Sequence, residues 1–397
     1  MSMVNLDMVF AGAQTVVSQD ELMARLKSGK QLNIKFGVDP TRPDLTFGHM
    51  VVFNKLRQFQ ELGHRAILLI GDHTATVGDP SGRSAERPQL TKEEVNDNAK
   101  TYLAQAFKIL DRDKTVVRRN SEWFSKMTFD DMLLLARKMT VARMLERDDF
   151  EKRYKANVPI SIVEFLYPLM QGYDSVALEA DVELGGSDQL FNMLVGRVLQ
   201  KDMGQAEQCV LSMPLLVGLD GVKKMSKSYD NYISFNDLPG DMFGKIMSIS
   251  DEIMWVYYGL LLGATADEIN EKKALHPMIA KKTLACLLVA KLYDRETADR
   301  ELENFENVFS KGEIPREMPT FSLKSLSDSA GDTNIVNLLA STELLSASRN
   351  EIRRMIEQKA LKIDGEIMDN ISYFLPADVR DNVVIQYGKK VFIKIIR

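Results

Sequence analysis

Two segments of different periodicity meet at the stretch Gly37-Val38-Asp39-Pro40-Thr41-Arg42-Pro43-Asp44-Leu45-Thr46-Phe47-Gly48-His49. Before it, residues 32–38 have the composition of a strand, which Gly37 and Pro40 close. After it, residues 49–62 place apolar side chains at helical spacing. The next segment, residues 66–71, is a short apolar run typical of a strand buried on both faces. Strand, helix and strand in this order predict a βαβ unit and therefore a parallel sheet.

The alternation of short strands and helices continues outward from this unit. Further strands are predicted at residues 115–117, 181–184 and 209–211, with a helix at residues 189–200. From about residue 235 the pattern is helical, and residues 310–333 have the composition of a linker. A basic helix and two further strands are then predicted at residues 346–356, 361–366 and 390–396.

These elements predict an α/β fold in three parts. The first is a Rossmann-type doubly wound parallel sheet in residues 1–235. The second is an α-helical domain in residues 236–333, and the third is a small α+β domain in residues 334–397.

Composition excludes several classes of protein. The chain has 397 residues, a net charge of −5, 45% apolar and 27% charged residues, which excludes a wholly disordered chain. Two cysteines and four scattered histidines exclude a disulfide framework, and no metal ligand is predicted. No N-terminal signal segment is recognisable, so the expected location is the cytoplasm. The net charge, taken alone, argues against nucleic-acid binding.

The stretch that joins the first strand to the first helix is a candidate ligand site. In open α/β sheets ligands bind at the carboxyl ends of the strands, and the amides of a helix N-terminus favour phosphate. Gly37 and Gly48 would let a ligand approach the backbone closely, while Thr41 and His49 offer a hydroxyl and a ring donor. The alternative is an ordinary strand-to-helix turn with a capping residue.

A second candidate site is the hexapeptide Lys223-Lys224-Met225-Ser226-Lys227-Ser228. Three lysines among small polar residues suit a polyphosphate, because ammonium groups form charge-assisted hydrogen bonds with phosphate oxygens. The alternative is a solvated run of surface charge.

Together the two segments resemble the paired signatures of class I aminoacyl-tRNA synthetases. Three more motifs lie between them in order: Gly78-Asp79-Pro80-Ser81-Gly82-Arg83, Glu164-Phe165-Leu166-Tyr167-Pro168-Leu169-Met170-Gln171-Gly172-Tyr173-Asp174 and Gly185-Gly186-Ser187-Asp188-Gln189. The set resembles the bacterial tyrosyl-tRNA synthetase family over essentially the whole chain. The resemblance implies ATP and L-tyrosine as substrates, tRNA(Tyr) as acceptor, Mg²⁺ held mainly by the ATP phosphates, and a homodimer.

The resemblance also implies roles for individual residues. Asp79, Tyr167 and Gln171 would face the ammonium group of tyrosine, and Tyr167 and Gln171 share a helix face because they are four residues apart. Asp174 would accept the phenolic hydroxyl, and Gln189 would contact the carboxylate. The residues implied for ATP binding or catalysis are Gly37, Asp39, Thr41, Thr46, Gly48, His49, Gly185, Asp188, Lys224 and Lys227.

Two positions depart from the family pattern. The usual motif is His-x-Gly-His, and Thr46 replaces its first histidine. The hydroxyl either lowers the rate of activation or takes over the donor role. Lys35, assigned to the tyrosine pocket, stands where many family members place a tyrosine near the substrate hydroxyl. It would lie over the ring edge, pair with Asp174, or point away.

The C-terminal part of the chain revises the charge argument. Residues 341–397 contain ten Lys and Arg against eight Asp and Glu, a balance of +2. Residues 348–365 resemble a small RNA-binding module shared with a ribosomal small-subunit protein, and the helical region resembles an anticodon-binding region. A basic stripe of this kind can follow RNA phosphates. The candidate tRNA-binding residues are Arg83, Arg87, Arg349, Arg353, Arg354 and Lys359.

The predicted activity is that of an aminoacyl-tRNA ligase acting on tyrosine. Two alternatives stay open. One is an adenylate-forming paralogue that passes the aminoacyl group to a small-molecule amine. The other is a non-catalytic RNA-binding protein on a synthetase scaffold.

Overall fold

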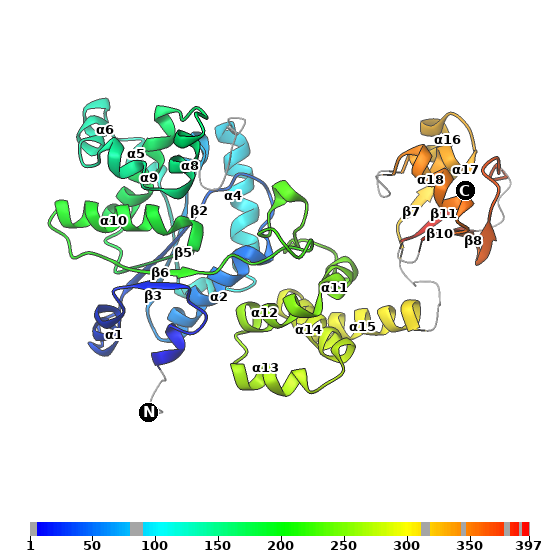
Figure 1. Ribbon diagram of the computed structural model, residues 1–397, viewed down its shortest axis with the longest axis horizontal. Helices are drawn as coiled ribbons and strands as arrows, with labels where there is room; N and C mark the ends of the chain where they lie inside the picture. The colour runs from blue at the N-terminus through cyan, green and yellow to red at the C-terminus, as the bar shows by residue number, and fades with distance from the viewer. Residues whose placement is uncertain are drawn as a thin grey trace. The chain divides into compact units, whose positions relative to one another are not determined.

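The computed structural model describes residues 6–79, 90–310, 318–342, 347–376, 382–388 and 391–396 (Figure 1). The chain forms two compact units, Met1–Glu301 and Leu302–Arg397. The predicted boundary near residue 235 falls inside the first unit, where the sheet gives way to helices. Within the described ranges, none of the helices has both the length and the apolar character needed to cross a membrane.

A six-stranded sheet with the order β1-β6-β5-β2-β3-β4 organises the first unit. Its strands are β1 (Thr15–Val17), β2 (Asn33–Val38), β3 (Arg65–Ile70), β4 (Thr115–Arg119), β5 (Val182–Gly186) and β6 (Cys209–Met213). All neighbours are parallel except β1, which pairs antiparallel with β6 at the edge. The predicted parallel α/β sheet is therefore confirmed, while the three-residue strand β1 was too short to give a sequence signal.

Helices surround this sheet and supply its core. They are α1 (Gln19–Lys27), α2 (Phe47–Glu61), α3 (Thr74–Val77), α4 (Lys92–Ala106), α5 (Ser121–Phe124), α6 (Phe129–Ala136), α7 (Val141–Met144), α8 (Asp148–Lys155), α9 (Ile162–Ala177) and α10 (Leu190–Asp202). Phe53 of α2 meets Phe36 of β2 edge to face, with ring centroids 5.3 Å apart. Burying one such side chain contributes roughly 1.5–3 kcal/mol, so the apolar stripe of α2 holds it against the strands.

The order of the strands reverses between β2 and β5. From β2 the chain moves through β3 to β4, and it then returns through α5–α9 to β5 on the other side of β2. In open α/β sheets the crevice at such a reversal, outside the carboxyl ends of the strands, is where ligands bind. The stretch 37–49 leaves β2 at this crevice.

The first unit continues into helices α11 (Pro239–Ser248), α12 (Asp251–Leu262), α13 (Ala266–Lys273) and α14 (Pro277–Leu292), and α15 (Arg295–Ser310) begins in it. Polar contacts fasten these helices to the rest of the unit. The Asn54 amide of α2 donates to the Leu261 carbonyl at 2.9 Å, and the buried Tyr257 hydroxyl donates to the Val217 carbonyl at 2.8 Å. The predicted change to helical structure after residue 235 is confirmed.

The second unit contains a five-stranded sheet with the order β7-β11-β10-β8-β9. Its elements are β7 (Thr320–Ser322), α16 (Leu323–Ala330), α17 (Ile335–Ala340), α18 (Arg349–Glu357), β8 (Leu361–Ile363), β9 (Glu366–Met368), β10 (Asn382–Tyr387) and β11 (Val391–Ile396). Ile352 and Ile356 of α18 are fully buried against Ile385 and Ile393 of the sheet. This is the predicted small α+β module.

The predicted boundary at residue 333 is wrong. Strand β7 pairs in parallel with β11, and Leu323 and Leu326 of α16 join the same apolar core. Part of the predicted linker, residues 320–330, therefore belongs to the C-terminal module, as a strand of its sheet and a helix packed on its core. Residues 311–317 lie outside the described residues. A three-residue strand and a serine-rich helix give too little periodicity to be recognised.

Candidate active site

Asp39 marks the carboxyl end of β2 at the crevice. Its Oδ1 accepts a hydrogen bond from the Thr74 hydroxyl at 2.8 Å, and its Oδ2 accepts one from the Tyr167 hydroxyl at 2.9 Å. Burial and the Asp39 charge raise the pKa of Tyr167 well above its usual range. A Cβ on Gly71 would stand 2.0 Å from Asp39 Oδ1, so only glycine fits beside this carboxylate. Asp39 thus joins β2 to α3 and α9 at the crevice.

Asp174 lies on α9 and is 3% exposed. Its Oδ1 accepts a hydrogen bond from the Trp123 indole at 2.9 Å, and Oδ2 accepts a long one from the Asn120 amide at 3.5 Å. Burial raises the pKa of Asp174 to about 7, although the charge of Lys35 and these hydrogen bonds act in the opposite direction. The carboxyl is therefore an oriented acceptor in an environment with little water.

A chain of side-chain amides connects α9 to the end of β5. Asn192 Nδ2 donates to Gln171 Oε1 at 3.0 Å and to Gln189 Oε1 at 3.1 Å. Gln189 Nε2 in turn donates to Asp79 Oδ2 at 3.0 Å. We call Gln171, Asn192 and Gln189 the amide chain. It brings together three residues that the sequence assigned to one pocket: Asp79, Gln171 and Gln189.

Lys35 lies opposite Glu183 in the register of β2 and β5. The two side chains are 1% and 2% exposed, and Lys35 Nζ is 2.9 Å from Glu183 Oε1. The sequence left three placements open for this lysine, and pairing with Glu183 was not among them. The structure therefore gives Lys35 a carboxylate on the neighbouring strand as its partner.

Thr46 and His49 form the start of α2. The Thr46 backbone N–H donates to His49 Nδ1 at 3.1 Å, and the Thr46 hydroxyl lies 3.0 Å from the same nitrogen. Since Nδ1 accepts, the ring hydrogen is assigned to Nε2. Burial, followed by the charge of Lys227, lowers the pKa of His49 to about 4. His49 is therefore a neutral donor near pH 7, and Thr46, 3% exposed, fixes its orientation.

The lysine-rich loop lies against the start of α2. Thr46 forms a β-bridge with Ser234, just beyond the loop, and a Cβ on Gly48 would stand 4.0 Å from the Met225 carbonyl oxygen. Lys224 Nζ is 2.8 Å from Asp188 Oδ2 at the end of β5. Lys227 Nζ lies 3.4 Å from the Tyr102 hydroxyl. The structure thus brings the two sequence signatures side by side at the start of α2.

The other predicted residues fall in three places. Gly37 is exposed on β2, and the Thr41 N–H donates to the Asp39 carbonyl at 2.8 Å. Gly185 packs closely, since a Cβ there would stand 2.9 Å from the Met193 sulfur. Arg83 and Arg87 lie outside the described residues. The exposed basic residues Arg349, Arg353, Arg354 and Lys359 lie in the second unit.

Four residues of the site were missed in the sequence: Trp123, Asn120, Asn192 and Glu183. A signal existed for Glu183, because a carboxylate in a predicted buried strand needs a buried partner, and Lys35 interrupts another such strand. Nothing in the sequence places Trp123 and Asn120 beside Asp174, since they come from a distant segment after β4. Within the described part of the chain, no three His, Cys, Asp or Glu side chains gather into a metal-binding group.

Known proteins of one family are similar to this chain in sequence. A sequence model described as tRNA synthetases class I (W and Y) matches residues 27–310. The tyrosine–tRNA ligase of Oleidesulfovibrio alaskensis is 51% identical over 397 residues, covering 98% of each chain. That of Francisella tularensis is 50% identical over 396 residues, again covering 98% of each.

A solved structure is similar as well. The tyrosyl-tRNA synthetase of Archaeoglobus fulgidus, crystallised with L-tyrosine, is 26% identical with a TM-score of 0.61, and the match covers 74% of this chain and 97% of that one. The sequence family, the parallel sheet and the two signatures side by side at the start of α2 agree, and the chain belongs to the class I tRNA synthetases of the tryptophan and tyrosine group.

Proposed function

We propose that this chain is a tyrosine–tRNA ligase, which forms tyrosyl-adenylate and pyrophosphate from L-tyrosine and ATP and then transfers the tyrosyl group to tRNA(Tyr). The observation that carries the proposal is the buried carboxyl of Asp174, which shares α9 with Tyr167 and Gln171. A buried acceptor that loses its partner is costly, so this pocket favours a phenol over a plain phenyl ring. Tyrosine-activating enzymes are themselves the standard example of this discrimination.

The amino-acid side of the cleft suits the zwitterionic part of tyrosine. Asp79 and the oxygen of Gln171 offer acceptors to the ammonium group, and Tyr167 is held beside them by Asp39. Gln189 is assigned to the carboxylate. The phenolic hydroxyl donates to Asp174.

Adenylate formation needs positioning and charge stabilisation rather than a covalent enzyme intermediate. The tyrosine carboxylate attacks the α-phosphorus of ATP, and pyrophosphate leaves. His49 donates through Nε2–H to the phosphates, with Thr41 on the same side of the cleft, while Lys224 and Lys227 neutralise charge from the opposite loop. Asp188 is assigned to a ribose hydroxyl, which requires Lys224 to leave it for the phosphates.

ATP carries the divalent cation that this chemistry requires. Mg²⁺ prefers oxygen ligands and usually keeps waters and phosphate oxygens. The carboxylates around the cleft, Asp39 and Asp188, hold protein partners at 2.8–2.9 Å, which fits a metal bound mainly through ATP. When bound, Mg²⁺ would offset charge on the phosphates.

The remaining parts of the chain are assigned to tRNA. The exposed arginines of α18 and Lys359 would contact phosphates, with Arg83 and Arg87 as further candidates. We assign residues 1–235 to catalysis, the following helices to the anticodon, and the C-terminal module to RNA binding. With these roles we expect the protein to act in the cytoplasm, together with the rest of translation.

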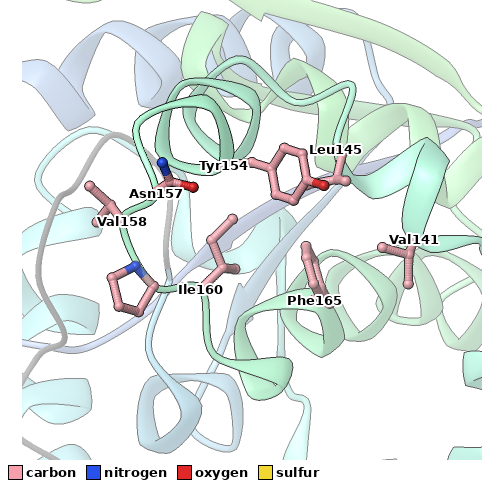
Figure 2. Close-up of a pocket in the computed structure, with 8 residues that line it drawn as sticks. Val141, Leu145, Tyr154, Asn157, Val158, Ile160 and Phe165 are labelled. Atoms are coloured by element: carbon pink, nitrogen blue, oxygen red, sulfur yellow. The ribbon is translucent and has the colours of Figure 1, made fainter.

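We further propose that the chain acts as a homodimer. Helices α6–α9 expose large apolar side chains: Phe129 at 77%, Leu134 at 56%, Val141 at 62%, Tyr154 at 65% and Ile162 at 80%. A pocket of about 350 Å³ lies on this surface. Figure 2 shows Tyr154 and Phe165 among the side chains that line it. Exposed apolar surface of this extent is typical of interfaces. Light scattering should give a dimer mass, and Ile162→Asp should give a monomer.

The activity is tested by exchange of labelled pyrophosphate into ATP with tyrosine, phenylalanine or tryptophan, followed by charging of tRNA. We expect exchange with tyrosine alone and charging of tRNA(Tyr). Exchange without charging would favour the paralogue that acylates a small amine. Absence of exchange would leave a non-catalytic RNA-binding protein, and preference for tryptophan would overturn the assignment of Asp174.

A further inference from the structure

The ion pair between Lys35 and Glu183 contacts Gln171, a residue that we assign to the ammonium group of the substrate. All three hydrogens of the Lys35 ammonium have oxygen partners: Glu183 Oε1 at 2.9 Å, the Ser175 hydroxyl at 2.8 Å and the Gln171 carbonyl at 2.9 Å. The group is therefore saturated as a donor and has no hydrogen left for a substrate. Lys35 can therefore influence substrate binding only by orienting the residues that it contacts.

Gln171 is held by both members of the ion pair. Lys35 holds its backbone carbonyl, and Glu183 Oε1 accepts from its side-chain Nε2 at 3.2 Å. The second oxygen of Glu183 accepts from Ser175 at 3.0 Å and from Gln208. Because an ionised carboxylate only accepts, it admits only the NH₂ end of the Gln171 amide.

The direction of the amide chain is fixed from both ends by this rule. Glu183 accepts from Gln171 at one end, and Asp79 accepts from Gln189 at the other. Asn192, between them, donates to both glutamine oxygens while its own oxygen accepts from Arg147 at 3.3 Å. With its nitrogen fixed on Glu183, Gln171 has a spare lone pair on Oε1, the correct acceptor for an ammonium group.

We propose that Lys35 and Glu183 are positioning residues for the amino-acid subsite, which fix the amide of Gln171 so that its oxygen faces the substrate ammonium group. The inference rests on the proposed function, because it takes tyrosine as the ligand. Lys35 pairs with the Glu183 carboxylate at 2.9 Å, and an unpaired carboxylate buried this deeply would be costly. The specificity for an α-amino group thus depends on two side chains that never touch it.

The test is to remove both charges at once, as Lys35→Met/Glu183→Gln. A neutral pair leaves no uncompensated buried charge, and such replacements often fold well. A glutamine at position 183 can present either oxygen or nitrogen to Gln171, so the direction of the amide chain is then enforced only from the Asp79 end. The two ligands are L-tyrosine and 3-(4-hydroxyphenyl)propionate, the same molecule without the amino group, both followed by calorimetric titration.

We expect the double variant to bind tyrosine at least tenfold more weakly than the wild type, with 3-(4-hydroxyphenyl)propionate bound equally by both. The control is Lys55→Met. Lys55 is another buried lysine, but its partners are the carbonyls of Met8, Val9 and Ala11 and the side chain of Gln58. The Lys55→Met variant should have a lower melting temperature than the wild type and the same affinity for tyrosine.

Two outcomes would overturn this inference and leave the proposed function standing. In the first, the double variant binds tyrosine as tightly as the wild type does. In the second, its affinities for tyrosine and for 3-(4-hydroxyphenyl)propionate fall by the same factor, which would indicate a purely structural role. A second neutral pair, Lys35→Gln/Glu183→Gln, provides another measurement if the first double variant does not fold, with the same expected difference between the ligands. A wild-type protein that fails to bind tyrosine would instead overturn the proposed function.

Discussion

Charged side chains are buried and paired in the proposed tyrosine pocket, whereas they are exposed on the arginine face of α18, which consists of Arg349, Arg353 and Arg354. In the cleft, Asp174, Lys35 and Glu183 are nearly excluded from solvent, and each has partners at hydrogen-bonding distance. On α18, Arg353 and Arg354 are exposed, and the Arg353 guanidinium donates to the Asn350 side chain of its own helix at 3.0 Å.

This difference matches two kinds of ligand. A small zwitterion is recognised by a few oriented groups in a dry pocket, where each unsatisfied polar atom costs roughly 1–3 kcal/mol. A nucleic acid presents many similar phosphates, and exposed cations bind them through a long-range attraction that salt weakens. Changes in the cleft should therefore alter chemistry with tyrosine and ATP, and changes on the arginine face should alter only RNA binding.

The largest effect is expected from Asp174→Asn. Removing the charge that we propose accepts the phenolic hydroxyl should lower kcat/KM for tyrosine in pyrophosphate exchange by roughly 100-fold, which corresponds to about 3 kcal/mol. The ratio of tyrosine to phenylalanine activation should fall with it. Unchanged discrimination would show that another group reads the hydroxyl.

A comparable loss is expected from Lys227→Met. Without this cation the transition state loses a phosphate partner, and the rate of adenylate formation should drop by about 100-fold. Tyrosine affinity, measured by titration, should change less than twofold. Lys223→Met is the matched control in the same loop, because Lys223 is exposed and lies over the Tyr229 ring, 4.9 Å from its centroid. Equal losses in both variants would contradict the assignment.

The pH dependence should come from Asp174 and not from His49. Burial raises the pKa of Asp174 to about 7, so its acceptor form is lost as the pH falls below 7. We expect kcat/KM for tyrosine to be level above pH 7.5 and to fall toward tenfold per pH unit below 6.5. His49, whose pKa is lowered to about 4, stays neutral throughout. The decline should vanish in Asp174→Asn.

The raised pKa of Asp174 affects the free energy of unfolding in the opposite direction: a higher pH favours activity but lowers stability. The folded protein holds the Asp174 proton up to about pH 7, whereas an unfolded chain loses it near its usual value of 3.8. The contribution of this group to the free energy of unfolding therefore decreases as the pH rises from about 4 to 7. Asp174→Asn should consequently melt at a higher temperature than the wild type at pH 8.

A smaller effect, of about tenfold, is expected from Arg353→Ala/Arg354→Ala on tRNA affinity. The slope of log affinity against log salt should become shallower by roughly 0.7–0.9 for each phosphate that the variant no longer neutralises. Pyrophosphate exchange should not change. Lys324→Ala, an exposed lysine on α16, serves as the control. Loss of pyrophosphate exchange in the double variant would contradict the prediction, because it would show that the arginine face also contributes to the reaction with tyrosine and ATP.

The smallest effect is expected from Thr46→Val. The His49 ring keeps its bond from the backbone N–H and loses only the hydroxyl, a change of about 1 kcal/mol. Adenylate formation should slow by about fivefold with tyrosine affinity unchanged. A complete loss of rate would mean that the Thr46 hydroxyl itself reaches the phosphates.

The sequence predicts the long central strands of the sheets better than the short strands at their edges. The strands β2 and β3 and helix α2 carry strong apolar periodicity, so the parallel sheet and the crevice follow from pattern alone. Strands β1 and β7 are three residues each, and they owe their existence to pairing with β6 and β11 rather than to composition.

The same distinction applies to the site. Motifs on single segments, such as residues 46–49 and 223–228, can be recognised because their chemistry is contiguous. The pairing of Lys35 with Glu183 depends on the register of two strands that are distant in the chain. Which partner a buried charge takes is decided by that register.

The separation of Lys35 and Glu183 along the chain also sets the order in which the two residues are synthesised on the ribosome. Lys35 and Glu183 are 148 residues apart, and a ribosome adding roughly 5–20 residues per second makes Glu183 roughly 7–30 s after Lys35. An ammonium group without its carboxylate is costly to bury, so β2 has to stay hydrated during that interval. Insertion of β5 beside β2 is then a late event in synthesis, and nascent chains that end before Gly186 cannot contain a finished amino-acid pocket.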